Sequence, residues 1–118
     1  MKTKTLVLLS LLLVLISCSK EDTQPKFTFS NGQTQGVADA NGEYTIMGHI
    51  SSNSNLDKVT LTKEGQNNPF FTDDSEAKNK NEYDFSYLIT GINSNTTIVL
   101  DAYDQNGSRQ TAKFYITK

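Results

Sequence analysis

Residues 82–90, EYDFSYLIT, place an aromatic or aliphatic side chain at every second position. Side chains alternate between the two faces of a β-strand, so this spacing puts Tyr83, Phe85, Tyr87 and Ile89 on one face and polar groups on the other. A helix would need apolar residues three or four positions apart to form one apolar face. The stretch therefore predicts a half-buried strand whose aromatic face belongs to the core.

The same period of two recurs over most of the chain. Strands are predicted at residues 26–30, 43–51, 56–63, 96–104 and 109–117, with a weaker candidate at 33–40. Phe, Tyr, Thr, Ile and Val are frequent in these stretches, and Asn and Gly separate them, which suits pleated, half-buried surfaces joined by turns. We therefore expect one small all-β domain, an antiparallel β-sandwich of about seven strands.

The pair Asn41-Gly42 is typical of a two-residue hairpin loop, because both positions of such a loop favour positive φ. This loop would pair residues 33–40 with residues 43–51. Val37 would then lie opposite Ile46 on the core face.

The last hairpin is constrained by the apolar faces of its two strands. Both strands face the core only if the numbers of paired residues sum to an even number, which a two-residue loop at Asn106-Gly107 does not give. We therefore expect a three-residue loop, 105–107, with Gly107 in the left-handed conformation and Asp104 capping the turn. The expected pairs are Leu100 with Ala112, Ile98 with Phe114, and Tyr103 with Arg109.

Five residues are candidate ligand contacts. Residues 64–81 form the longest irregular stretch, and such loops are usually functional or mobile. It contains Phe70 and Phe71, whose rings would either stack on a sugar or close the open end of the sandwich as a plug or short strand. The outer face of the last hairpin would expose the other three: Tyr103, Arg109 and Tyr115.

No set of residues forms a catalytic or metal-binding motif. His49 is the only histidine, and no Ser- or Cys-containing motif completes a site around it, so a half-exposed strand position explains it. The turns at 39–43 and 101–106 offer oxygen ligands without the spacing of a calcium loop, and hairpin turns use the same residues for backbone reasons. We expect no enzyme activity, no metal and no cofactor.

The charge of the chain excludes two classes of partner. Beyond residue 17 it carries nine basic and thirteen acidic residues. This mild acidity argues against nucleic acid and gives no attraction to anionic lipid. A glycine-rich phosphate loop and a basic patch with aromatics are both absent from the sequence.

The N-terminal segment has the order of a secretory signal: Lys2 and Lys4, then an apolar run from Leu6 to Ile16, then the small Ser17. At about 1.5 Å per helical residue, the run spans roughly half the hydrocarbon core of a bilayer, so it is too short to cross it. The only Cys of the chain follows directly at position 18, which excludes an internal disulfide.

Leu15, Ile16, Ser17 and Cys18 resemble the lipobox of bacterial lipoproteins. The resemblance implies that the thiol of Cys18 takes a diacylglyceryl group, that the chain is cut just before it, and that palmitate-type acyl chains anchor the mature protein in a membrane. It divides the chain into a signal peptide at 1–17, an acylated Cys and polar tether at 18–26, and the folded domain at 27–118.

The residues after the lipobox resemble the export signal of Bacteroidota-type surface lipoproteins. They are Ser19, Lys20, Glu21 and Asp22. The resemblance implies an outer-membrane protein that faces the cell exterior, with the periplasm as the alternative location. The same residues also suit a solvated tether, because they are polar and cannot bury a core.

The folded part resembles bacterial immunoglobulin-like domains between about Tyr44 and Thr117. The closing pattern of 102–104, an Asn106-Gly107 turn and a last strand with Phe114 and Ile116 is similar to theirs, as are residues 48–50 followed by 56–59. The resemblance implies an immunoglobulin-like sandwich. The chain lacks the Trp and the disulfide of antibody-type domains, so its core must depend on Tyr, Phe and Ile.

Two functions follow from these resemblances. In the first, the protein is a membrane-anchored, non-catalytic binding or adhesion module for a glycan or for an envelope or host protein. In the second, it is a structural or assembly accessory that docks to another envelope protein. The sequence does not choose between them.

Overall fold

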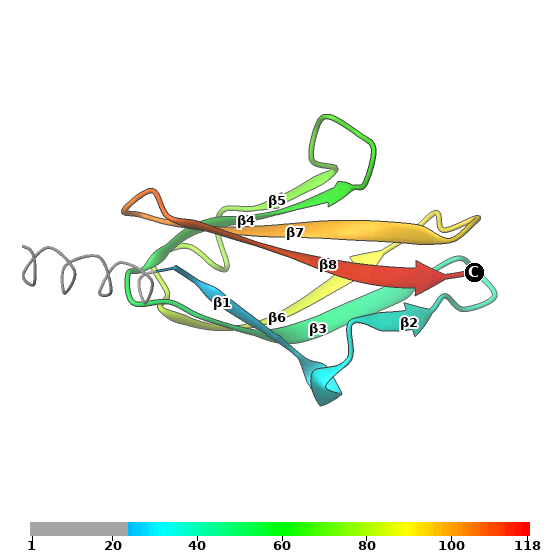
Figure 1. The fold of residues 1–118 in the computed structure, drawn as a ribbon, viewed down its shortest axis with the longest axis horizontal. Helices are drawn as coiled ribbons and strands as arrows, with labels where there is room; N and C mark the ends of the chain where they lie inside the picture. The colour runs from blue at the N-terminus through cyan, green and yellow to red at the C-terminus, as the bar shows by residue number, and fades with distance from the viewer. Residues whose placement is uncertain (1–23) are drawn as a thin grey trace, which may run out of the picture.

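The computed structural model describes residues 24–118, so the predicted signal peptide, Cys18 and the export signal at 19–22 lie outside the described residues. Over the described range the chain forms eight strands and one 3-10 turn, Ser30–Gly32 (Figure 1). The strands are β1 (Lys26–Phe29), β2 (Gln35–Val37), β3 (Tyr44–Ser51), β4 (Leu56–Lys63), β5 (Phe71–Asp73), β6 (Glu82–Ile89), β7 (Thr96–Asp104) and β8 (Arg109–Thr117). Within this range no helix is long and apolar enough to span a membrane.

The strands form two sheets that lie face to face (Figure 1). One has three strands in the order β1-β3-β6, and the other has five in the order β2-β8-β7-β4-β5. All neighbouring strands are antiparallel except β2 and β8, which are parallel. The predicted all-β sandwich is confirmed, with eight strands in place of about seven.

The core comes from the alternating positions that the sequence predicts. β6 buries Phe85, Tyr87 and Ile89, and the facing strands of the other sheet bury Ile98, Leu100 and Phe114. Aromatic rings meet across the three-stranded sheet, where Phe85 lies edge-on to Phe29 with 6.1 Å between ring centroids. Ile92 is also buried although it lies in the loop after β6, which the alternation does not predict.

The last hairpin has the predicted geometry. Leu100 pairs with Ala112, Ile98 with Phe114 and Tyr103 with Arg109. Gly107 has a φ of +89°. The carboxylate of Asp104 accepts hydrogen bonds from the backbone N–H groups of Asn106 at 2.9 Å and Ser108 at 2.8 Å, so it caps the three-residue loop.

The hairpin predicted at Asn41-Gly42 is wrong. β2 pairs with β8 in the five-stranded sheet and β3 pairs with β1 and β6 in the other, so Val37 does not face Ile46 and is 67% exposed. The turn itself forms, because the Asp39 carboxylate accepts N–H groups of the residues at 41 and 43. The turn therefore carries the chain from one sheet to the other, which its local sequence does not distinguish from a hairpin.

The sandwich has two ends, which we call the entry end and the far end. At the entry end the described chain enters β1 at Lys26, which pairs with Ser51, and Ser51 pairs with Glu82. Pro25, just before β1, is buried. The far end contains Tyr44 and the last residue of β6, which pair with each other, together with the C-terminus (Figure 1). The seven residue steps of β3 separate the ends by about 23 Å.

Candidate functional site

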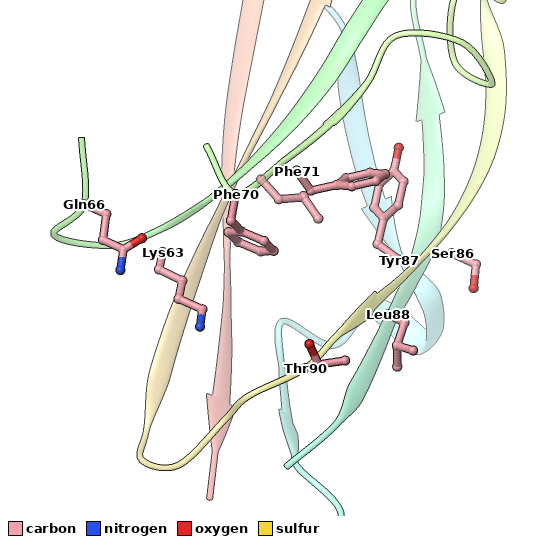
Figure 2. A pocket seen from close by; sticks show the side chains of 9 residues that line it. Lys63, Gln66, Phe70, Phe71, Ser86, Tyr87, Leu88 and Thr90 are labelled. Atoms are coloured by element: carbon pink, nitrogen blue, oxygen red, sulfur yellow. The ribbon is translucent and has the colours of Figure 1, made fainter. Parts of the chain in front are cut away.

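A cavity of ≈ 480 Å³ opens at one side of the sandwich, near its far end. Its volume lies within the range of small-molecule binding sites. Its lining residues come from β4, β5 and the loop between them in one sheet, and from β6 and the residue after it in the other, and β5 and β6 are edge strands. It is lined by Leu61, Lys63, Gln66, Phe70, Phe71, Ser86, Tyr87, Leu88 and Thr90 (Figure 2).

Two adjacent phenylalanines form the apolar part of this cavity. Phe71 belongs to β5 and packs against Tyr87 of the facing sheet, with 5.5 Å between ring centroids. The backbone N–H of Phe70 donates to the carbonyl of Leu61 at 2.9 Å, which holds the start of β5 against β4. Phe70 and Phe71 remain 42% and 44% exposed as residues, so the short strand that contains Phe71 leaves both accessible.

Lys63 is the only charged residue among those that line the cavity. Its Nζ lies over the ring of Phe70, 5.8 Å from the centroid. In the part of the chain that the structure describes, no carboxylate lies within ion-pair distance of Lys63. The neighbouring Glu64 pairs with Lys113, at 2.6 Å. The cavity therefore presents an unneutralised positive charge beside an aromatic surface.

The structure separates the five predicted ligand contacts into three places. Phe70 and Phe71 line the cavity. Tyr103 and Arg109 lie together on the outer face of the five-stranded sheet near the entry end, where Lys58 and Arg109 both cover the Tyr103 ring. Tyr115 is exposed on β8, six positions beyond Arg109, about 20 Å along the strand. No single ligand of small size contacts all five.

Two cavity residues that the sequence interpretation missed break the strand patterns in which they occur. Lys63 follows Val59 and Leu61 at a core-facing position, where an apolar residue is expected. Leu88 occupies a solvent-facing position of β6 and is 59% exposed. A charged residue on the inner face and an apolar residue on the outer face are the signals by which the sequence could have located the cavity.

Asp73 is a buried carboxylate that joins the two sheets. Its Oδ2 accepts hydrogen bonds from the hydroxyls of Tyr83 at 2.9 Å and Tyr87 at 2.8 Å, both on the facing sheet. Its Oδ1 accepts the backbone N–H groups of residues 75–77. Burial alone would raise the pKa of Asp73, but these hydrogen bonds, led by that of Tyr87, lower it. Burial and then the Asp73 carboxylate raise the pKa of Tyr83 to about 12, so the hydroxyl remains a donor.

His49 lies between two carboxylates on the outer face of the three-stranded sheet. Its Nε2 lies 2.7 Å from Oε1 of Glu82 and its Nδ1 lies 2.7 Å from Oδ1 of Asp84, both on the neighbouring β6. Thr28 of β1 is its partner on the other side. The hydrogen bonds to Glu82 and then to Asp84 raise the pKa of His49. The residue lies on the strand face predicted for it, and the two acidic partners were not predicted.

This cluster predicts a pH dependence of stability. Because the pKa of His49 is higher in the folded chain, its contribution is complete below the ordinary histidine pKa and is lost as the pH rises through the folded value. We expect His49→Gln to lower the free energy of unfolding at about pH 5, by less than about 1 kcal/mol because all three groups are well exposed, and to have little effect at about pH 9. Urea denaturation at both pH values checks this, and an equal effect at the two would contradict it.

Among residues 24–118, no three His, Cys, Asp or Glu side chains gather closely enough to hold a metal ion. In each of the two acidic turns at 39–43 and 101–106, one carboxylate caps backbone N–H groups, Asp39 in the first and Asp104 in the second. These contacts are the backbone role that the sequence offered as the alternative to calcium.

Comparison with known proteins gives a likeness of fold. No family profile and no curated protein matches the chain. Among solved structures, it is similar to a chain of the Clostridium thermocellum CbhA fibronectin(III)-like modules, with 18% sequence identity and a TM-score of 0.54. The match covers 80% of this chain and 46% of that chain, so this chain spans a little under half of its length. At this identity the likeness shows the fold alone, and it confirms the predicted immunoglobulin-like β-sandwich.

Proposed function

We propose that the protein is a lipid-anchored, non-catalytic binding module of the bacterial outer membrane that takes a glycan into the Phe70/Phe71 cavity on the cell exterior. The observation that carries the proposal is the cavity itself, with two accessible aromatic rings and polar side chains at its margin. Aromatic faces bind the apolar face of a ring ligand, and a few polar groups fix its orientation.

The position of the cavity in the fold supports this proposal. Cys18 precedes β1, and β1 begins at the entry end of the sandwich. The cavity lies towards the far end, because it is lined by Lys63, the last residue of β4, and by Thr90, which directly follows β6. A chain anchored through Cys18 would thus carry its binding site on the side remote from the membrane.

Binding of labelled glycans to whole bacteria that express the full chain tests this function. We expect cells with the wild-type chain to bind, and cells with Phe70→Ala to lose most of the binding because one of the two accessible aromatic rings is removed. Cells with Cys18→Ser should bind little, because the unacylated chain is not retained at the membrane. Labelled palmitate should be incorporated into the wild-type chain and not into Cys18→Ser.

The matched control for this test is Tyr115→Ala. Tyr115 is as exposed as Phe70, 47% against 42%, but lies on the outer face of β8 away from the cavity. Binding should survive this change at equal surface amounts of protein, which protease shaving of the cells measures. Equal loss in both variants, or binding by cells with Phe70→Ala, would contradict the assignment of the cavity.

A second function is favoured by the free edge of β6. β6 is eight residues long and ends its sheet, so one of its edges has no partner strand among the described residues, whereas the other edge strands have only three or four residues. Such an edge can pair with a strand of another protein. We therefore propose, as the alternative, an assembly accessory that docks to an envelope protein through β6. A stable co-purifying envelope protein that is lost with Leu88→Lys, together with no glycan binding, would favour it.

A further inference from the structure

We propose that the glycan unit held in the cavity is an anionic sugar, and that Lys63 pairs with its carboxylate or sulfate group. This inference rests on the proposed function and adds the chemical class of the ligand. In this inference Phe70 and Phe71 contact the ring of the sugar, and Lys63 pairs with its negative charge. The two contacts can be tested separately.

The charge distribution of the chain is the first reason. Acidic residues outnumber basic ones beyond residue 17, yet none of the nine residues that line the cavity is acidic and one is a lysine. A cavity of one charge sign attracts ligands of the other sign. The lining of the cavity thus carries a positive charge although the chain as a whole is acidic, and this difference favours an anionic ligand.

The state of Lys63 is the second reason. Of the lysines on β4 and β8, Lys113 is engaged by Glu64 and Lys58 covers the ring of Tyr103 on the outer face. Lys63 instead lies at a core-facing position at the end of its strand, with its ammonium group over Phe70 at the cavity. Figure 2 shows Lys63 and Gln66 on one side of Phe70, with Leu88 and Thr90 across the cavity from them. An anion bound there would meet a cation that needs no prior release from a carboxylate.

The remaining polar groups favour a sugar over an acidic peptide. The side chains of Gln66, Ser86 and Thr90 line the cavity, and no hydrogen bond ties any of them to another described residue. Amide and hydroxyl groups both donate and accept, as the hydroxyls of a sugar do. Aromatic rings, uncommitted hydroxyls and one cation together match a ring ligand that has hydroxyls and one negative charge.

Titration of the full chain, purified in mild detergent, with three oligosaccharides tests this inference. The probes are a hexuronate-containing oligosaccharide, its carboxyl-reduced neutral form, and a sulfated derivative of that neutral form. We expect one or both anionic probes to bind, the neutral form to bind about three- to tenfold more weakly, and Lys63→Gln to remove that difference. Added salt should weaken binding by the wild type and not by Lys63→Gln. The carboxylate and sulfate arms identify which anion is preferred.

Two variants make the result specific to Lys63. Lys58→Gln removes another lysine that covers an aromatic ring, at 5.0 Å and on the outer face, and should change nothing. Lys63→Arg keeps the charge and should keep most of the preference for the anion. Equal binding of the neutral and anionic forms, lost with Phe70→Ala but unchanged by Lys63→Gln, would overturn the inference and leave the proposed function intact. Binding of an acidic peptide and of no oligosaccharide would overturn both the inference and the glycan ligand.

Discussion

Replacing Asp73 by Ala is expected to lower the free energy of unfolding by about 3 to 5 kcal/mol, a large part of the stability of a domain of this size. The carboxylate is only 5% exposed, and both of its oxygens accept hydrogen bonds. Alanine leaves the buried Tyr87 hydroxyl, the Tyr83 hydroxyl and the N–H groups of the following turn without their acceptor. It also removes the hydrogen bonds that join β5 to the facing sheet.

Two further variants separate this effect from a general loss of charge. Asp73→Asn can still cap the turn through its carbonyl but cannot accept from both tyrosine hydroxyls, so it should fall between wild type and Ala. Asp74→Ala removes the exposed neighbouring carboxylate and should change stability by less than about 0.5 kcal/mol. Urea denaturation followed by far-UV circular dichroism gives these values, and a loss with Asp74→Ala equal to that with Asp73→Ala would contradict the assignment.

Acid should reduce the difference in free energy of unfolding between wild type and Asp73→Ala. The pKa of Asp73 is lower in the folded chain, so its contribution is complete above the ordinary carboxyl pKa and is lost as the pH falls through the folded value. The two unfolding curves should therefore approach each other in acid. If wild type and Asp73→Ala differed by as much in acid as at neutral pH, the ionised Asp73 carboxylate could not be the source of the stabilisation.

The sequence predicts those parts of the fold that depend on local alternation. β3, β4, β6, β7 and β8 appear where the period of two places them, because each strand has one face against the core. The register of the last hairpin follows from the same rule, since both of its strands must bury their apolar residues. Local pattern and local turn geometry decide these features together.

The parts that the sequence misses depend on partners far away in the chain. β2 is three residues long and has no buried face, so only its pairing with β8, about eighty residues later, defines it. Asp73 stands in a run of acidic residues that resembles a solvated loop, and the tyrosines whose hydroxyls donate hydrogen bonds to its buried carboxylate lie on the other sheet. The sequence groups five residues as candidate ligand contacts, but strand topology divides them between the cavity and two separate places on the outer face of the five-stranded sheet.

Replacing Gly48 by Ala is expected to lower the free energy of unfolding by about 2 to 4 kcal/mol. Gly48 lies on the inner face of β3, paired with Phe29 on one side and Phe85 on the other. A Cβ at this position would lie 2.5 Å from the backbone carbonyl oxygen of Thr28 and 2.8 Å from the Phe85 ring. The Thr28 oxygen belongs to the backbone of β1, so the strand itself would have to shift. The missing side chain is thus what lets the two phenylalanine rings meet over the centre of the three-stranded sheet.

The comparison that isolates this steric effect is Gly91→Ala. Gly91 has a φ of +71° and open space around its Cα, so alanine there adds backbone strain of about 1 kcal/mol without any overlap. Gly48 has an ordinary strand φ, so alanine there adds overlap without that strain. A larger loss at position 48 than at position 91, measured by urea denaturation, would show that close packing of β1 against β3 fixes this residue. If Gly48→Ala were as stable as wild type, β1 would have to be loosely held, and the aromatic cluster over β3 could not be the tightly packed core that its ring contacts imply.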